Sequence, residues 1–173
     1  MRQVLLCFML LPICASMGYT QDAGDVYQQA AVQKLNNAKA YTLEVADLMP
    51  GENYAFQPTI EQMSFAEQLL HLSSNLQRLS AKLNNSTPPV NIDPKVTDKA
   101  QVREVVEQTY DYAIAVMTAF ETEQLGDTVD FFAGPKTKLQ IANLINDHQT
   151  HHRGQLLVYL RLQGVEPPRY IGW

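Results

Sequence analysis

Cysteine, long apolar runs and clusters of basic residues are all scarce in this chain of 173 residues. An apolar run from Val4 to Ala15 follows the positive start Met1-Arg2 and precedes small residues, which is the layout of a secretory signal peptide. The run is shorter than the ~20 apolar residues that anchor a protein in a bilayer. We therefore predict a leader over residues 1–20, cleaved between residues 16 and 20, and an exported, periplasmic or extracellular protein. The alternative is a buried N-terminal helix.

The two cysteines, Cys7 and Cys14, both lie in the predicted leader. The mature chain would therefore have no disulfide, no thiol nucleophile and no cysteine metal ligand. A lipoprotein anchor at Cys14 is the less favoured prediction, because Ile13 before it is bulkier than such sites usually accept.

Positive charge is also scarce once the leader is removed. Loss of Arg2 from 13 basic residues leaves 12 against 18 acidic ones, a net charge of −6 with histidine neutral. The mature chain has no basic stripe, which argues against nucleic-acid binding. An acidic surface also disfavours tight binding to anionic membranes. We expect no stable membrane insertion after leader removal.

Apolar residues make up 46% of the chain, which excludes a disordered protein and leaves enough for one core. Periodic apolar residues predict four helices of ~20 to 27 residues in a single domain over residues 21–173, an all-α four-helix bundle. The predicted helices run from Asp25 to Leu48, from a capping box at Ser64 to Leu83, from a cap at Thr97 or Asp98 to Thr122, and from a cap at Thr137 to Gln163. Gly164 is placed to end the last helix in a left-handed conformation.

The linkers are long for a simple bundle. The 13 residues from Asn85 to Thr97 can span up to ~43 Å, against ~37 Å for a 25-residue helix. One linker could therefore cross the bundle, although length alone does not say which. The loop from Glu123 to Lys136 contains two glycines and a proline and is predicted to include a short extended piece at Val129 to Phe132.

The last helix carries two histidines on its predicted inner face. They belong to a stripe with alternating spacings of four and three residues, formed by Ile141, Ile145, His148, His152, Gln155, Tyr159 and Leu162. His148 and His152 are thus one turn apart on one face, while His151 falls on the flank. Two buried imidazoles need a partner for their ring nitrogens, and a metal ion supplies one. A polar core layer bonded to Tyr, Gln or water is the alternative.

Two further residues are harder to assign. His71 lies off the leucine stripe of the second helix, among Glu67, Gln68 and other polar residues, and by pattern alone it is a solvated histidine. Gly154 in the middle of a helix costs ~1 kcal/mol relative to alanine. Close approach of another helix backbone would compensate for that cost, and simple tolerance is the alternative.

Three stretches of the chain resemble the DinB/YfiT-like superfamily of metal-binding bundles. The first, Ser64 to Leu72, is similar to a capped second helix with a ligand histidine. The second, His148 to Gln155 continuing through Leu160 to Pro168, closely resembles the family's last helix and tail. The loop Tyr54 to Pro58 is also similar, although Phe56 stands where the family often has tryptophan.

The resemblance implies a metal site and a topology. It implies His71, His148 and His152 as ligands of one divalent ion, with His151 outside the set. It also implies an up-down-down-up bundle whose second and third helices run parallel, so that the linker from Asn85 crosses over. A homodimer is compatible with it. Zincin and di-iron sites fit worse, because no Glu lies between His148 and His152 and no histidine has Glu three residues before it.

Three functions remain open at this point. The first is a metal-dependent hydrolase or transferase acting on a small molecule, with zinc or nickel as the favoured ion and iron or manganese also compatible. Its general base is unassigned; Glu67, Asp147, Tyr54 and Tyr159 are candidates by position. The second is a non-catalytic, stress-associated metal-binding bundle, and the third is a metal-free helical domain with a polar core. Transfer of low-molecular-weight thiols, known in the family, fits poorly with an exported protein.

Overall fold

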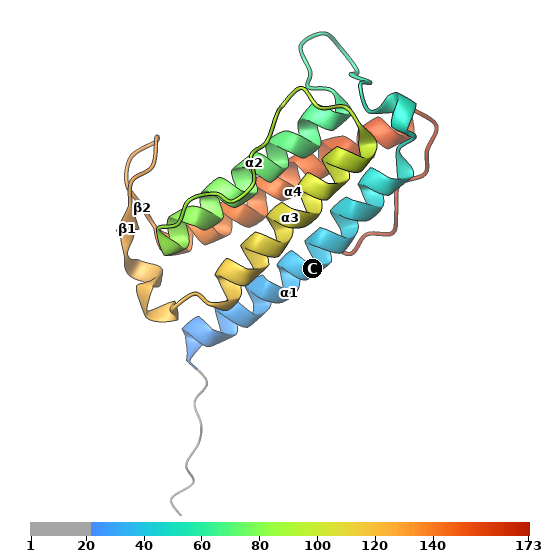
Figure 1. Ribbon diagram of the computed structural model, residues 1–173. Coiled ribbons are helices and arrows are strands. Elements are labelled where there is room, and N and C mark those ends of the chain that lie inside the picture. The colour runs from blue at the N-terminus through green and yellow to red at the C-terminus, as the bar shows by residue number, and fades with distance from the viewer. Residues whose placement is uncertain (1–21) are drawn as a thin grey trace, which may run out of the picture.

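Four long helices form the body of the protein in the computed structural model, which describes residues 22–173 (Figure 1). They are α1 (Ala23–Leu48), α2 (Phe65–Asn84), α3 (Lys99–Thr118) and α4 (Lys138–Leu162). Two short 3-10 helices, η1 (Gly51–Asn53) and η2 (Thr122–Gly126), and a small hairpin of β1 (Thr128–Val129) and β2 (Lys136–Thr137) complete the elements. The predicted all-α four-helix bundle is therefore confirmed. The predicted leader lies outside the described residues. No described helix combines the length and apolar character needed to cross a membrane.

The helices follow an up-down-down-up order. In Figure 1, α1 and α4 run in one direction, while α2 and α3 run parallel to each other in the opposite direction. The chain between α2 and α3 therefore crosses the length of the bundle, as the resemblance implied. The buried side chain of Gln77 on α2 holds this linker, donating to the Val90 carbonyl at 2.8 Å and accepting from the Val90 N–H at 3.0 Å.

Side-chain caps fix where the helices begin. The Ser64 N–H donates to the Glu67 carboxylate at 2.7 Å, and the Glu67 N–H donates to the Ser64 hydroxyl at 3.3 Å, which completes the predicted capping box. Thr137 caps α4 in the same way with Gln140, and Asp98 rather than Thr97 caps α3. The predicted end of α3 at Thr122 is four residues too late, because the chain turns into η2 there.

The leucine stripe of α2 is buried as predicted, whereas the stripe of α4 departs from the prediction. All six apolar positions of the α2 stripe are in the core: Phe65, Leu69, Leu72, Leu76, Leu79 and Leu83. On α4, Ile141, Ile145 and Tyr159 are buried, but Leu162 is 57% exposed. A stripe with a 3.5-residue period drifts ~20° per heptad around a straight helix, so the predicted face has rotated away from the core by the last turn.

Gly154 within α4 and the loop before α4 both differ from the sequence predictions. A Cβ on Gly154 would meet nothing within 4 Å, so the predicted close approach of another helix is wrong. The predicted extended piece is shorter and starts earlier than expected, at Thr128–Val129, and it pairs antiparallel with Lys136–Thr137. Gly134, with φ of 88°, turns the hairpin, and the ammonium of Lys82 on α2 donates to the Asp130 carbonyl at 2.7 Å. The hairpin is therefore tethered along one side of α2.

Candidate metal centre

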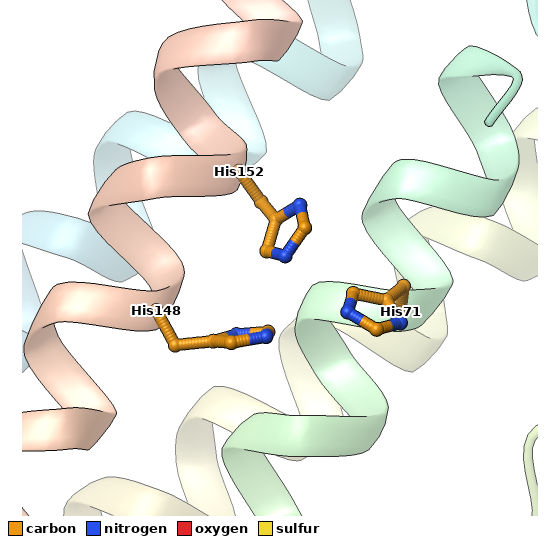
Figure 2. Close-up of side chains that lie close together, drawn as sticks. All are labelled: His71, His148 and His152. Carbon is orange, nitrogen blue, oxygen red and sulfur yellow. The ribbon is translucent and has the colours of Figure 1, made fainter. Parts of the chain in front are cut away.

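Three histidines from two helices meet between α2 and α4 (Figure 2). His71 lies two turns beyond the cap of α2, while His148 and His152 project from consecutive turns of α4. Their ring centroids are 5.1 Å apart for His71 and His148, 4.6 Å for His71 and His152, and 4.4 Å for His148 and His152. One ring nitrogen from each lies within 4.8 Å of the others. The structure thus brings together all three residues predicted as ligands.

The position of His71 overturns the prediction from pattern alone that it is a solvated histidine. The polar face of α2 that carries it faces α4 rather than bulk water, and His71 is half-buried. Burial lowers the pKa of the His71 ring below its usual value. Hydrophobic periodicity misses such a residue because the surface it faces is a polar cleft rather than the core.

Burial also keeps the other two rings neutral. Burial and, to a smaller extent, the neighbouring histidines lower the pKa of both His148 and His152 to about 4. His152 is only 6% exposed, and His148 is half-buried. At neutral pH the cluster therefore presents unprotonated ring nitrogens, the form in which imidazole binds a metal.

Gln68 fixes the orientation and tautomer of His152. Its side-chain oxygen lies 2.7 Å from Nδ1 of His152, and because an amide oxygen can only accept, Nδ1 carries the proton. The Nε2 nitrogen is then left with a free lone pair. Gln68 is buried, and its amide nitrogen lies 3.5 Å from the Tyr159 hydroxyl, which donates to the Met63 carbonyl at 2.9 Å. Sequence reasoning missed this role; the only signal was the position of Gln68 one turn before His71.

Asn75 and His151 border the cluster, and the His151 ring centroid lies 4.9 Å from that of His152. The side-chain amide of Asn75, one turn after His71, lies 3.3 Å from Nε2 of that ring and donates to the His71 carbonyl at 3.2 Å. His151 is exposed and contacts the Gln155 side chain at 3.3 Å. It is not one of the three clustered ligand candidates, in agreement with the resemblance.

The donor set fits one divalent ion. Nitrogen ligands bound at ~2.0–2.1 Å to one zinc ion lie at most ~4.2 Å apart, so small side-chain rotations would close the observed cluster around an ion. Among residues 22–173, no carboxylate belongs to the group, so it offers three neutral nitrogens and no fourth protein ligand. Three protein ligands with an open position are typical of catalytic rather than structural zinc sites.

A pocket of about 810 Å³ opens beside the cluster. His71 and His148 form part of its wall, whereas His152 does not line it. The other lining residues come from α2, the hairpin and α4: Ser74, Asn75, Arg78, Leu79, Lys82, Asp130, Phe131, Phe132 and Leu144. A small molecule in this pocket would reach the histidines from one side.

None of the four residues considered as a general base lines this pocket. The Glu67 carboxylate is engaged in the cap of α2, and Asp147 lines a separate, smaller hollow. The Tyr54 hydroxyl is buried and donates to the Ala46 carbonyl at 2.8 Å, and burial raises its pKa. Tyr159 serves the His152 orientation described above. The positional assignments of a base are therefore not supported by the geometry.

Comparison with known proteins identifies the family. The family model of the DinB superfamily matches residues 34–156. The uncharacterized protein YjoA of Bacillus subtilis is 27% identical over 136 residues, which cover 75% of this chain and 86% of YjoA. The crystal structure of that DinB-like protein superposes with a TM-score of 0.67 at 23% identity, covering 82% of this chain and 96% of the other.

Two other solved structures share the fold. A DinB-like protein from Bacillus cereus superposes with a TM-score of 0.72 at 15% identity and covers 82% of this chain and 96% of its own length. A conserved protein from Enterococcus faecalis superposes with a TM-score of 0.67 at 18% identity, with coverages of 78% and 95%. The matched family model spans α2, α3 and most of α1 and α4, including all three clustered histidines, and the chain belongs to the DinB superfamily.

Proposed function

We propose that this protein is an enzyme that holds one divalent ion through His71, His148 and His152 and carries out hydrolysis or group transfer on a small molecule. The observation that carries the proposal is the meeting of three neutral imidazoles, two of which line a pocket of about 810 Å³, with no fourth ligand in the described cluster. Zinc and nickel suit three imidazole ligands best, and iron or manganese are also compatible.

The chain's own residues prepare the site in three ways. Gln68 holds the His152 proton on Nδ1 and leaves Nε2 free, and Asn75 restrains the His71 ring. Phe131 and Phe132 line the pocket and limit the water that surrounds a bound substrate. A divalent ion bound here would lower the pKa of a coordinated water toward ~7 and polarise a substrate oxygen.

The second candidate is a non-catalytic metal-binding bundle. It is favoured by the finding that none of Glu67, Asp147, Tyr54 and Tyr159 lines the pocket. An enzyme without a protein base would depend on the ion, its water or the substrate for proton transfer. The two candidates therefore predict the same metal content and differ only in turnover.

We also propose that the protein acts outside the cytoplasm, on the basis of the leader pattern in residues 1–20. Mass spectrometry of the N-terminus of protein recovered from the periplasm would test this. Recovery of the uncleaved chain from the cytosol would overturn it and would revive the transfer of low-molecular-weight thiols as a function. A homodimer stays a prediction, which sedimentation analysis of the purified chain would test.

The catalytic proposal is tested by metal analysis followed by an activity screen. Protein purified without added metal should contain about one divalent ion per chain by elemental analysis. It should then hydrolyse or transfer at least one ester, amide, phosphoester or thioether in a broad panel, and lose that activity with chelator and in a His148→Asn variant. A His151→Asn variant is the matched control and should stay active. Metal at one ion per chain without turnover in any panel would support the non-catalytic bundle instead.

A further inference from the structure

The pocket beside the histidines has a charged wall of its own on α2. Asn75, Arg78 and Lys82 follow His71 at spacings of four, three and four residues, so they continue along the same face of the helix. The Cα of Arg78 lies two turns from that of His71, about 10 Å along the helix axis. Since side chains tilt toward the N-terminus of a helix, the Arg78 side chain leans back toward the histidines.

Arg78 and Lys82 differ in the contacts that their side chains make. The Lys82 ammonium is engaged by the Asp130 carbonyl, where it tethers the hairpin. The Arg78 guanidinium forms no ion pair or side-chain hydrogen bond with any residue in the 22–173 range. The nearby Asp130 carboxylate also lines the pocket, but it lies beyond ion-pair distance of Arg78. The lining thus carries two cations and one anion in a chain whose net charge is −5.

The lining also includes apolar residues, one of which is far more exposed than large apolar side chains usually are. Phe132 at the hairpin tip is 94% exposed, although it is a large aromatic residue. Phe131 beside it is half-buried, and Leu79 and Leu144 extend the apolar surface toward the histidines. A ligand covering Phe132 would remove apolar surface from water, which is favourable.

We infer that the pocket selects a small amphipathic oxyanion as substrate: a molecule whose carboxylate or phosphate binds Arg78, whose apolar body packs on Phe131 and Phe132, and whose reacting group reaches the histidines. The fork of N–H donors on arginine pairs bidentately with either oxyanion. The spacing along α2 requires the anionic and reacting groups to be roughly 10 Å apart or less. This inference rests on the proposed function only in treating the ligand as a substrate; the oxyanion site itself does not require the metal.

The experiment measures binding of 4-phenylbutyrate, its neutral isostere 4-phenylbutyramide, and phenyl phosphate by ligand-observed NMR titration. It uses the full mature chain in both metal-loaded and metal-free form. The acid should bind about tenfold more tightly than the amide in both forms, because a hydrogen bond to a charged group contributes substantially more than a neutral one. Binding of phenyl phosphate shows whether the site prefers a phosphate or a carboxylate.

Three variants separate the parts of the inference. Arg78→Gln should abolish the preference for acid over amide, whereas Arg161→Gln, an exposed arginine on the last turn of α4, should leave it unchanged. Phe132→Ser should weaken the acid and the amide alike. Both Arg78 and Phe132 are exposed, so these variants should melt near the wild-type temperature.

The outcomes distinguish this inference from the proposed function. Equal binding of acid and amide, or an acid preference that survives Arg78→Gln, would overturn the oxyanion site. An acid preference that exists only in the metal-loaded form would likewise overturn it, since the carboxylate would then be binding the ion. An Arg78-dependent preference in protein that never retains metal would support the oxyanion site while refuting the metal-dependent enzyme.

Discussion

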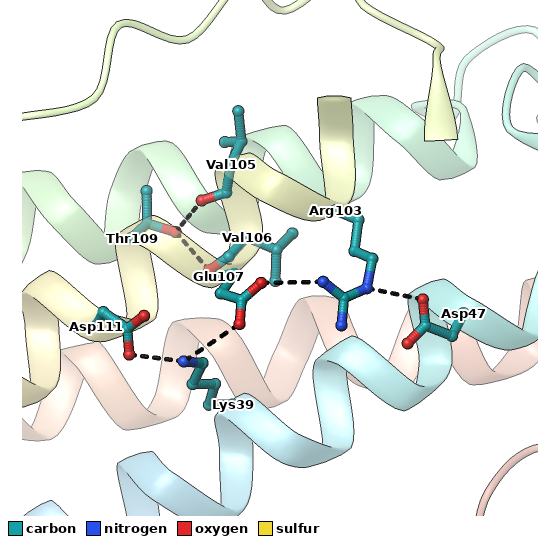
Figure 3. Close-up of polar contacts among 8 residues, drawn as sticks. All are labelled: Lys39, Asp47, Arg103, Val105, Val106, Glu107, Thr109 and Asp111. Carbon is teal, nitrogen blue, oxygen red and sulfur yellow. Dashed lines mark hydrogen bonds and ion pairs between the residues drawn. The ribbon is translucent and has the colours of Figure 1, made fainter. Parts of the chain in front are cut away.

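Polar groups at the interface between α1 and α3 are arranged differently from those at the interface between α2 and α4. Across α1 and α3, charged side chains pair with one another at the surface (Figure 3). Lys39 donates to Asp111 at 2.6 Å, and Arg103 bridges Asp47 and Glu107, each at 2.9 Å. Across α2 and α4, three neutral rings face one another instead, with no carboxylate in their group among the described residues.

The first interface holds polar contacts that join two helices, and the second holds a group of side chains that could bind a metal ion. In the first interface each donor has an acceptor, so the contacts are complete without any other molecule. In the second, three half-buried or buried rings each bring one nitrogen within 4.8 Å of the others.

The largest expected effect comes from removing a clustered ring. His148→Ala or His152→Ala should weaken metal binding by more than ~100-fold, because two nitrogens hold a divalent ion far less well than three. Competition with a chromogenic chelator measures the affinity. His151→Ala is the control and should bind as the wild type, since its ring lies outside the ligand group. Equal loss in all three variants would indicate a site different from the one described here.

A smaller effect is expected from the residue that orients His152. Gln68→Met keeps the length of the side chain but removes the acceptor for Nδ1–H, and loss of such a partner typically costs 10–100-fold in metal affinity. Gln77→Met, another buried glutamine on α2, should leave the affinity unchanged while losing about 1–2 kcal/mol of stability through its bonds to the crossover linker. Wild-type metal affinity in the Gln68→Met variant would show that Gln68 does not orient His152 for metal binding.

The third prediction concerns the metal-free protein at acid pH. Burial and the neighbouring rings lower the pKa of His148 and His152 to about 4, whereas an unfolded histidine has a pKa of ~6.5. Between these values the unfolded chain binds protons that the folded chain does not, so the free energy of unfolding falls as the pH drops from 6.5 to 4. Urea titrations at a series of pH values measure the slope.

A variant isolates this contribution from the titration of acidic groups. A His148→Gln, His152→Gln chain lacks both titrating rings, so its stability should change less steeply with pH between 6.5 and 4. Parallel slopes for the two proteins over that window would show that the rings do not have lowered pKa values in the metal-free state. Bound metal should steepen the wild-type slope, since protons compete with the ion for the same nitrogens.

The sequence predicted much of the fold because its signals were local. The capping boxes at Ser64 and Thr137 set helix starts to the residue, and the stripe from Phe65 to Leu83 set the buried face of α2. The direction of α3 could not be predicted from local signals. The length of the linker only permitted a crossover, and the family resemblance indicated that this linker makes it. Nothing in the spacing marks Gln77 as the residue that holds that linker.

The site was less predictable because its polar residues face a cleft. Two histidines on α4 were found from spacing, but His71 needed the resemblance, since a polar helix face looks the same whether it borders water or a second helix. Gln68 was not found, because its role depends on the 2.7 Å approach of a ring 84 positions away in the chain. The 3.5-residue period of the α4 stripe also predicted the wrong face for Leu162, because such a stripe drifts around a straight helix.

The smallest effect is expected where the polar contacts are already complete. A double-mutant cycle of Lys39→Met and Asp111→Asn should give a coupling free energy of only about 0.2–1 kcal/mol, because the Asp111 side chain is 59% exposed and water competes for both charges. The coupling should shrink further in 1 M salt, and metal affinity should not change. A coupling above ~2 kcal/mol would mean that the α1–α3 contacts depend on both of their partners as strongly as metal binding depends on the histidines. The two interfaces would then differ in their chemistry alone and not in their function.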